Sequence, residues 1–204
     1  MKIFCIGRNY VEHAKELNSP LPENPVFFMK PETAMVRGDC TFHYPSFSKE
    51  IHHEVEIVFR ICRQGKEITV EKALEYIDAV TLGLDFTARD IQQKCKEKGL
   101  PWEISKAFDQ SSPLSDRFIP LSEVKNLHNI RFSMELNGKK VQEGSSAEMI
   151  FPPEKLVAYI SRFITIEAGD LLYTGTPAGV GPVKPGDVLT AFMEGDRMLE
   201  CRIH

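Results

Sequence analysis

The sequence lacks paired cysteines. Its five cysteines are widely scattered, and no two of them form a C-x-x-C motif. This usage argues against a disulfide framework and is typical of a protein that keeps free thiols in a reducing compartment. We therefore expect a cytoplasmic location and buried, unreactive cysteines, with a catalytic cysteine as the less common alternative.

The sequence also lacks long apolar runs, basic blocks, internal repeats and low-complexity tracts. Because no run is long enough to cross a bilayer, we expect no membrane segment. Lys and Arg number 25 against 29 Asp and Glu, and the resulting net charge of −4 gives no indication of a nucleic-acid partner. Met1 to Ile6 reaches Gly7 too early for a signal peptide and lacks the composition of a transit peptide, so we expect a first strand there.

The composition is that of an ordinary globular protein, with 42% hydrophobic and 9% aromatic residues. A chain of 204 residues fits one domain, 1–204, whose core needs no disulfides. In the carboxyl-terminal part, short alternating segments separated by Gly- and Pro-containing turns predict a sandwich or barrel-like roll. The strands expected there are 130–136, 139–143, 171–174, 188–193 and 198–203, with Asn137-Gly138 as the turn of a hairpin.

Four short helices are expected, over 10–17, 67–76, 87–98 and 153–164. The first and third begin at apparent capping boxes, Asn9 with Glu12 and Thr87 with Asp90. The third is expected to stop at Gly99. The fourth begins with a proline and has an apolar stripe that predicts core packing: Leu156, Val157, Ile160, Phe163 and Ile164.

Residues 51–61 alternate with a period of two, which predicts one half-buried strand. Glu54 and Glu56 would project from its polar face about 6.5–7 Å apart and could converge on one point. Two carboxylates that close need a proton, an arginine or a cation between them, and oxygen ligands favour Mg²⁺, Mn²⁺ or Ca²⁺ over Zn²⁺. More commonly, two such carboxylates simply lie on the solvent-exposed face of a strand.

Asp85 follows a continuous apolar segment, 79–84, which is typical of a buried strand. A carboxylate there needs a metal, an arginine or a cluster of hydrogen bonds, unless it caps the following helix. Lys106 stands among apolar residues and is a candidate for functional burial. Lys30 ends another apolar strand, where functional groups often gather, although a surface lysine is the default expectation.

His13 and Glu16 lie three residues apart, so they share one face of the first helix. A histidine oriented by a carboxylate is the usual general-base pair, but a polar helix that shows both side chains to water is more common.

The glycine-rich segment 175–181 has neither the ending of a phosphate loop nor the setting of a dinucleotide fingerprint, so we expect no nucleotide binding. Its amides, with the Thr176 hydroxyl, could cradle a carboxylate, and a plain turn is the alternative.

Six motifs follow one another along the chain: Gly7-Arg8-Asn9-Tyr10-x-x-His13-x-x-Glu16, Phe28-x-Lys30-Pro31, His53-Glu54-Val55-Glu56, Asp85-x-Thr87-Ala88-Arg89-Asp90, Lys106-Ala107-Phe108 and Gly175-Thr176-Pro177-x-Gly179-Val180-Gly181. Each motif alone is weak. Together, and in this order, they resemble the fumarylacetoacetate hydrolase family over the whole chain, and most closely its short branch of acylpyruvate hydrolases and oxaloacetate decarboxylases.

This resemblance implies an α+β, predominantly β fold, a mixed β-sandwich roll with short flanking helices, usually a homodimer. It implies an N-terminal strand and mobile lid over 1–45 and the roll over 46–204. It also implies one Mg²⁺ or Mn²⁺ on Glu54, Glu56 and Asp85. The catalytic residues that it implies are His13, Glu16 and Lys106, and the substrate-binding residues are Gln92, Thr176 and Gly175.

The implied reaction is hydrolytic cleavage of the C–C bond of an acylpyruvate, a small 2,4-dioxo acid, through a pyruvate enolate. Oxaloacetate decarboxylation, keto–enol tautomerisation and isomerisation of 2-hydroxyhepta-2,4-diene-1,7-dioate can use the same machinery and remain alternatives. So do a non-catalytic metal- or ligand-binding protein and a structural domain whose carboxylates pair with Arg60 and Arg89. Relatives commonly carry Thr-Ser where this chain has Ser146-Ala147, which puts the identity of the substrate in question.

Overall fold

The computed structural model describes residues 1–17 and 19–204, and β-sheet dominates them. An eight-stranded sheet has the order β2-β1-β13-β6-β7-β9-β3, with β10 also paired to β7. Its strands are β1 (Ile3–Gly7), β2 (Val26–Lys30), β3 (Met35–Arg37), β6 (Val55–Ile61), β7 (Ile77–Leu84), β9 (Ser112–Leu114), β10 (Ile119–Pro120) and β13 (Leu171–Tyr173).

Two further sheets complete the roll. The five-stranded sheet has the order β12-β11-β15-β16-β4, with β4 (Cys40–Phe42), β11 (Arg131–Leu136), β12 (Lys139–Ser145), β15 (Val188–Met193) and β16 (Asp196–Ile203). A small sheet has the order β14-β5-β8, with β5 (Ile51–His53), β8 (Thr87–Ala88) and β14 (Gly181–Pro182). The predicted α+β, mainly β roll is therefore confirmed.

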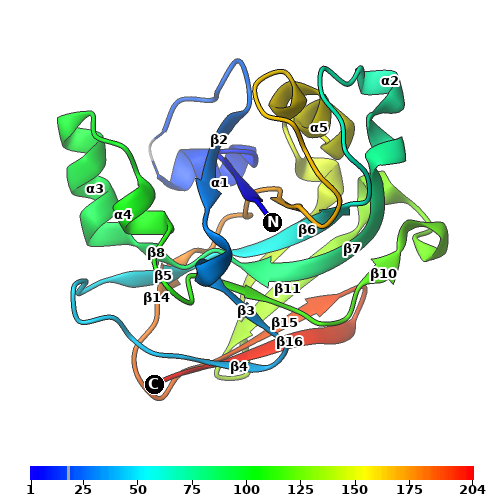
Figure 1. Ribbon diagram of the computed structural model, residues 1–204. Helices are drawn as coiled ribbons and strands as arrows, with labels where there is room; N and C mark the ends of the chain where they lie inside the picture. The colour runs from blue at the N-terminus through cyan, green and yellow to red at the C-terminus, as the bar shows by residue number, and fades with distance from the viewer. Residues whose placement is uncertain (18) are drawn as a thin grey trace.

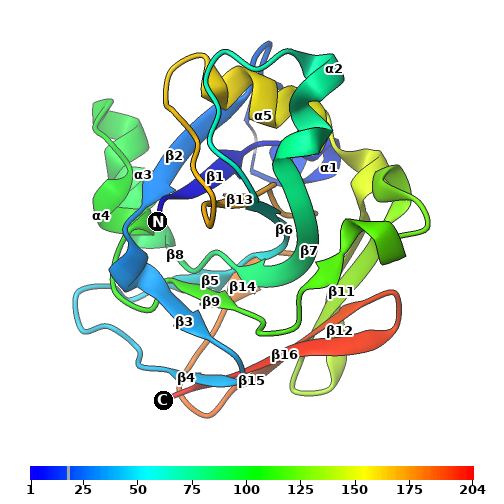
Figure 2. The ribbon, with the colours of Figure 1, turned by 45° about the vertical axis from the view of Figure 1, so that its right-hand side comes forward.

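The helices are short and flank the sheets. They are α1 (Val11–Glu16), α2 (Val70–Ala73), α3 (Arg89–Lys98), α4 (Glu103–Lys106) and α5 (Pro153–Ser161), with 3₁₀ turns at Glu32–Ala34, Leu74–Tyr76, Leu121–Glu123, Leu127–Asn129 and Ser146–Glu148. Figures 1 and 2 show α3 and α4 together on one side, α2 and α5 together at the top, and the five-stranded sheet at the bottom. None of the helices in the described ranges has the length and apolarity needed to cross a membrane.

The main core fills the space between the two large sheets. Ile57 and Leu82 from one sheet share it with Phe132 and Leu189 from the other. A second cluster, which includes Val58 and Tyr173, covers the opposite face of the eight-stranded sheet. Burial on both faces explains why the prediction of a half-buried strand over 51–61 is wrong, because nothing on β6 but Arg60 reaches water to any extent.

The same segment is also two strands rather than one. β5 pairs with β8 and β14 in the small sheet, and β6 pairs with β7 and β13 in the large one. The chain changes sheets at Glu54. This break turns a run of alternating residues into a corner, which the period-two pattern alone could not reveal.

The hairpin and the end of the third helix are confirmed. Asn137 and Gly138 both have positive φ, 53° and 76°, as a type I′ turn requires. Gly99 ends α3 in the left-handed conformation, with φ of 63°.

Both predicted capping boxes are wrong. The N-cap residues of α1 and α3 are Tyr10 and Ala88, and neither helix has a side-chain cap. The Asp90 carboxylate instead accepts hydrogen bonds from the Ser48 hydroxyl and the Lys49 amide, so a tertiary contact takes the place of the local one.

Two other helix predictions are only partly right. The helix expected over 67–76 is reduced to α2 and the 3₁₀ turn that follows it. α5 starts at Pro153 as predicted but ends at Ser161, and Phe163 beyond it is 55% exposed instead of lying in the core.

All five cysteines are free thiols, as predicted. Cys5, Cys95 and Cys201 are buried, and Cys40 and Cys62 are half-buried.

Candidate metal and catalytic site

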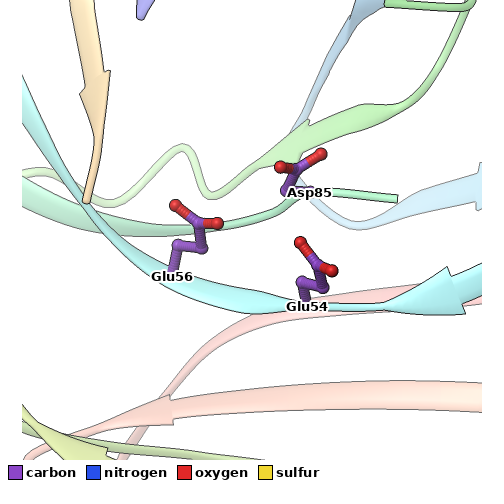
Figure 3. A group of neighbouring side chains, drawn as sticks. All are labelled: Glu54, Glu56 and Asp85. Carbon is purple, nitrogen blue, oxygen red and sulfur yellow. The ribbon is translucent and has the colours of Figure 1, made fainter. Parts of the chain in front are cut away.

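Three carboxylates meet where β6 and β7 run side by side. Glu54 precedes β6, Glu56 lies on it, and Asp85 directly follows β7, so the Asp85 amide donates a 2.8 Å hydrogen bond to the Glu54 carbonyl. All three residues are at least 96% buried, at 4%, 1% and 1% exposure. One oxygen from each lies within 4.8 Å of the others, and Figure 3 shows the three side chains as close neighbours. This is a hard, all-oxygen ligand set.

A buried lysine and a half-buried arginine contact two of these carboxylates. Lys106 Nζ donates to Glu54 Oε2 at 2.7 Å and to Asp85 Oδ2 at 2.8 Å, and Arg89 donates to the other oxygen of Glu54. Burial by itself would raise the pKa of Glu54, but the charges of Lys106 and Arg89 outweigh it and hold that pKa well below its usual range. Glu54 is therefore ionised.

Glu56 is in a different electrostatic position. Burial, together with the charges of Asp85 and Glu54, raises the pKa of its carboxyl well above the usual range. A 2.7 Å hydrogen bond from the Gly175 amide to this carboxyl opposes the rise of its pKa. These effects favour the protonated form of the Glu56 carboxyl, and a cation held at the cluster would oppose them.

One carboxylate oxygen of the cluster has no hydrogen-bond donor among the described residues, and this bears on whether a metal ion fits there. Asp85 Oδ1 is buried and has no hydrogen-bond donor in the described structure. Lys30 Nζ lies 2.8 Å from it, close enough for an ion pair but not oriented for a hydrogen bond, so a lone pair stays unused. A buried oxygen in this state is costly. The residues present therefore fit a divalent cation held by Glu54, Glu56 and Asp85.

The predicted dyad is present on α1. His13 is 6% exposed, and its Nδ1 lies 3.2 Å from Glu16 Oε2. Burial lowers the pKa of His13, although Glu54 and Glu16 partly oppose this, so the ring is neutral near pH 7 and can accept a proton. Glu16 in turn accepts a 3.1 Å hydrogen bond from the Gly179 amide, which ties α1 to the glycine-rich segment.

The glycine-rich segment cradles a carboxylate of the protein itself. The Gly175 amide donates a hydrogen bond to Glu56 at 2.7 Å. The Thr176 hydroxyl donates to the Val55 carbonyl and accepts from the Gln142 amide, and both of these bonds are 2.8 Å long. Thr176 also lines the pocket beside the cluster. Its hydroxyl is thus engaged in bonds that hold β6 against this segment.

Replacing Gly175 with Ala is expected to destabilise the protein by more than the roughly 1–3 kcal/mol of backbone strain alone. Gly175 has φ of +94°, and an added Cβ would come within 2.9 Å of Asn9 Cβ and 3.2 Å of the Ile6 carbonyl oxygen. Gly186→Ala is the matched control, because Gly186 has the same φ and no described residue lies within 4 Å of a Cβ added there. Urea denaturation would measure both, and equal losses would contradict a steric role for Gly175.

A narrow pocket opens onto the cluster. Its volume is about 30 Å³, roughly the space of one water molecule. His13 and Leu17 of the α1 segment form part of its wall, and Gln92 is buried in it with its oxygen 2.7 Å from Arg89 Nη1. The structure thus brings all nine predicted site residues to this pocket or into contact with its walls.

Several residues of the site were not predicted. Lys30 was expected at the surface, but it is 2% exposed and faces Asp85, because its strand ends under α4. Arg89 was considered only as a structural partner and binds both Glu54 and Gln92, whereas Arg60 pairs with Asp78 far from the cluster. Lys30 and Arg89 both belong to the six motifs quoted above, so the motifs could have predicted that these residues lie in the site.

Gln142 had no sequence signal at all. Its side chain is buried on the hairpin strand β12, where it accepts from the Val55 amide and donates to Thr176 and Pro177. The nearby departure at Ser146-Ala147 lies outside the described lining of the pocket. The Ser146 hydroxyl donates to the Leu127 carbonyl and accepts from the Ile130 amide, so it stabilises the local backbone.

Comparisons with known proteins agree on the family of this chain. The family described as fumarylacetoacetate (FAA) hydrolase C-terminal matches residues 2–204. The mitochondrial oxaloacetate decarboxylase of Dictyostelium discoideum is 43% identical over 195 residues, covering 95% of this chain and 89% of that protein. An oxaloacetate tautomerase of Escherichia coli (strain K12) is 44% identical over 195 residues, with the same coverage.

The similarity extends to solved structures. The crystal structure of fumarylpyruvate hydrolase from Pseudomonas aeruginosa in complex with Mn²⁺ and pyruvate superposes with a TM-score of 0.94 at 36% identity, covering 100% of this chain and 89% of that one.

Proposed function

We propose, from the premise that the chain belongs to the fumarylacetoacetate hydrolase family, that it is a metal-dependent enzyme that cleaves the C–C bond of acylpyruvates. One observation carries the proposal. A buried, neutral His13 and the cluster of Glu54, Glu56 and Asp85 line the same pocket, so a general base faces a cation site. A pure binding protein needs no such base.

The cation would be Mg²⁺ or Mn²⁺, and the Mn²⁺ and pyruvate bound by the Pseudomonas relative support this choice. When bound, it would act as a Lewis acid toward the carboxylate and 2-oxo oxygens of the substrate. Glu54, Glu56 and Asp85 would hold it.

The chain's own side chains would then perform the proton transfers. His13, held by Glu16, takes a proton from water, and the hydroxide attacks the C4 carbonyl of a 2,4-dioxo acid. The C3–C4 bond then breaks, which releases the acyl part as a carboxylic acid and leaves the pyruvate enolate. The enolate takes the proton from His13 at C3 to give pyruvate. Lys106, whose pKa is raised because Asp85 and Glu54 outweigh the effect of burial, stays charged and stabilises the negative charge that develops on the enolate oxygen. Gln92 and Thr176 line the pocket where they can orient the substrate.

A second candidate is decarboxylation or keto–enol tautomerisation of oxaloacetate. The names of the two relatives that are 43% and 44% identical favour it. Loss of CO₂ from oxaloacetate gives the same enolate without added water, so the same residues serve both reactions.

Absorbance assays separate these candidates. We would follow loss of the enol absorbance of acetylpyruvate, and in parallel the consumption of oxaloacetate, with Mn²⁺ and with excess EDTA. Mn²⁺-dependent loss of acetylpyruvate supports the hydrolase, and activity on oxaloacetate alone supports the second candidate. Inactivity on both would overturn an enzymatic role for this site.

Metal binding itself has a thermodynamic test. At a Mn²⁺ concentration one hundred times the Kd, the free energy of unfolding is expected to rise by about 2.7 kcal/mol, because the cation binds only the folded cluster. Melting curves with Mn²⁺, Mg²⁺ and EDTA measure this rise. An unchanged melting temperature would instead support a structural cluster whose charges are already paired.

Three further properties are part of the proposal. The α1 segment within residues 1–45 would act as the lid, since it walls a pocket too small for the substrate. The protein would be a cytoplasmic homodimer, acting on small 2-oxo acids. Light scattering of the purified protein would test the dimer.

A further inference from the structure

The pocket contains more positive than negative groups. The charged residues that line it are Arg8, Arg89, Lys96 and Lys106 against Glu54, Glu56 and Asp85. His13 adds no charge, because burial lowers its pKa. A divalent cation on the three carboxylates would leave a still larger positive excess, which one substrate carboxylate does not neutralise.

Two of these cations differ from the others. Arg89 and Lys106 are paired with Glu54 or Asp85. Within residues 1–17 and 19–204, by contrast, no carboxylate lies within the 4.0 Å ion-pair distance of Arg8 or Lys96. Burial and the nearby charges of Arg89 and Arg8 lower the pKa of Lys96 to about 8, since Glu54 compensates only in part and Lys106 adds to the repulsion. Among the described residues, Lys96 thus sits in a mainly positive environment without an ion-pair partner.

Arg8 and Lys96 converge on one aromatic ring. The guanidinium carbon of Arg8 lies 5.8 Å from the centroid of the Trp102 ring, and Lys96 Nζ lies 5.6 Å from it. Both distances are within the range of cation–π contact, which aligns the two charges beside the pocket. All three side chains are only half-buried, so they stand at the mouth of the pocket.

The backbone fixes Arg8 in this place. Arg8 has φ of 60°, a left-handed conformation that costs a non-glycine residue free energy. The next residue, Asn9, is fully buried and bonds to the carbonyls of Phe151 and Thr174, so the turn cannot relax. A strained arginine held at a pocket mouth without an ion-pair partner indicates a ligand contact.

We propose that Arg8, Lys96 and Trp102 form a subsite for a second carboxylate of the substrate, so that the enzyme prefers 2-oxo dicarboxylates to 2-oxo monocarboxylates. This inference rests on the proposed function, in which the first carboxylate and the 2-oxo oxygen lie at the cation. The cation–π contacts hold the two charges in place for the second carboxylate, and charge-assisted hydrogen bonds to it replace their contacts with water.

Unreactive ligand pairs test the subsite independently of turnover. Calorimetry in the presence of Mn²⁺ would give the Kd of 2-oxoglutarate against 2-oxopentanoate, and of 2-oxoadipate against 2-oxohexanoate. The wild type is expected to bind at least one dicarboxylate about tenfold or more tightly than its matched monocarboxylate. Lys96→Met and Arg8→Gln are expected to remove most of that preference, with less than about twofold change for the monocarboxylate.

The same helix offers a matched control. Lys98 is exposed on α3, so Lys98→Met removes one positive charge without touching the pocket and should keep the preference. If Lys98→Met loses it equally, general charge and not the subsite is responsible. Equal losses for both ligands of a pair in Lys96→Met, or no preference in the wild type, would also overturn the inference. Absence of binding of every 2-oxo acid would overturn the proposed function itself, and the subsite with it.

A pH series gives a second readout. Lys96 has its pKa near 8, so its charge is present below that pH and is lost above it. The groups around it are Arg8, Arg89, Lys106 and Glu54. The preference of the wild type should therefore fall between about pH 7.5 and 9.5, whereas Lys96→Arg should retain it. A preference that falls equally in both proteins would contradict a role for Lys96.

Discussion

Replacing His13 with Asn is expected to lower kcat for acylpyruvate hydrolysis by about 10²–10⁴-fold, the usual contribution of a positioned general base. Asn keeps a polar group beside Glu16 but cannot take a proton from water. Affinity for Mn²⁺ should stay unchanged, because His13 is not among the cluster's oxygen ligands. Initial rates on acetylpyruvate and a Mn²⁺ titration of the same preparation would measure both effects.

His128→Asn is the control for this change, since His128 is exposed and absent from the pocket lining. Decarboxylation of oxaloacetate requires no activated water, so His13→Asn should reduce it much less than hydrolysis. A variant that hydrolyses acetylpyruvate at the wild-type rate would eliminate His13 as the base.

Asp85→Asn is expected to lower the free energy of unfolding of the metal-free protein by about 3–5 kcal/mol, the cost of removing one partner from a buried ion pair. Asp85 faces both Lys30 and Lys106, and neither lysine is more than 4% exposed in its side chain. The amide leaves these two ammonium groups with the charge of Glu54 alone. Chemical denaturation in EDTA measures the loss.

Glu56→Gln distinguishes the role of the cluster in binding a metal ion from its role in the stability of the metal-free fold. Burial and two neighbouring carboxylates raise the pKa of Glu56 and so favour its uncharged form in the metal-free protein. Gln is also uncharged and can still accept the Gly175 hydrogen bond. We expect a change in stability below about 1 kcal/mol in EDTA. Asp85→Asn and Glu56→Gln should both lose the stabilisation that Mn²⁺ gives the wild type. Equal destabilisation of the two in EDTA would contradict this division of roles.

The sequence was informative where local pattern and geometry coincide. The hairpin at Asn137-Gly138, the stop at Gly99 and the proline start of α5 follow from backbone preferences that tertiary contacts do not change. The ordered motifs identified the residues of the site because the family resemblance links positions that lie far apart in the chain.

The failures have a common physical cause. Asn9 and Asp90 were expected to belong to capping boxes, but each side chain is used for a contact across the fold. Glu54 looked like a member of a continuous strand, yet it marks the change between two sheets. The burial of Lys30 and Gln142 depends on strands that are distant in sequence, which a window of neighbouring residues does not contain.

The ammonium groups of Lys30 and Lys106 also bear on how this protein matures. They already compensate the charges of Asp85 and Glu54, so the apo fold has no uncompensated anions to force apart its central strands. In zinc fingers, by contrast, metal binding supplies the energy of folding itself. We therefore expect this chain to reach its native state without waiting for a cation. Metal supply would then regulate how many molecules are active, and it would further stabilise a fold that has already formed.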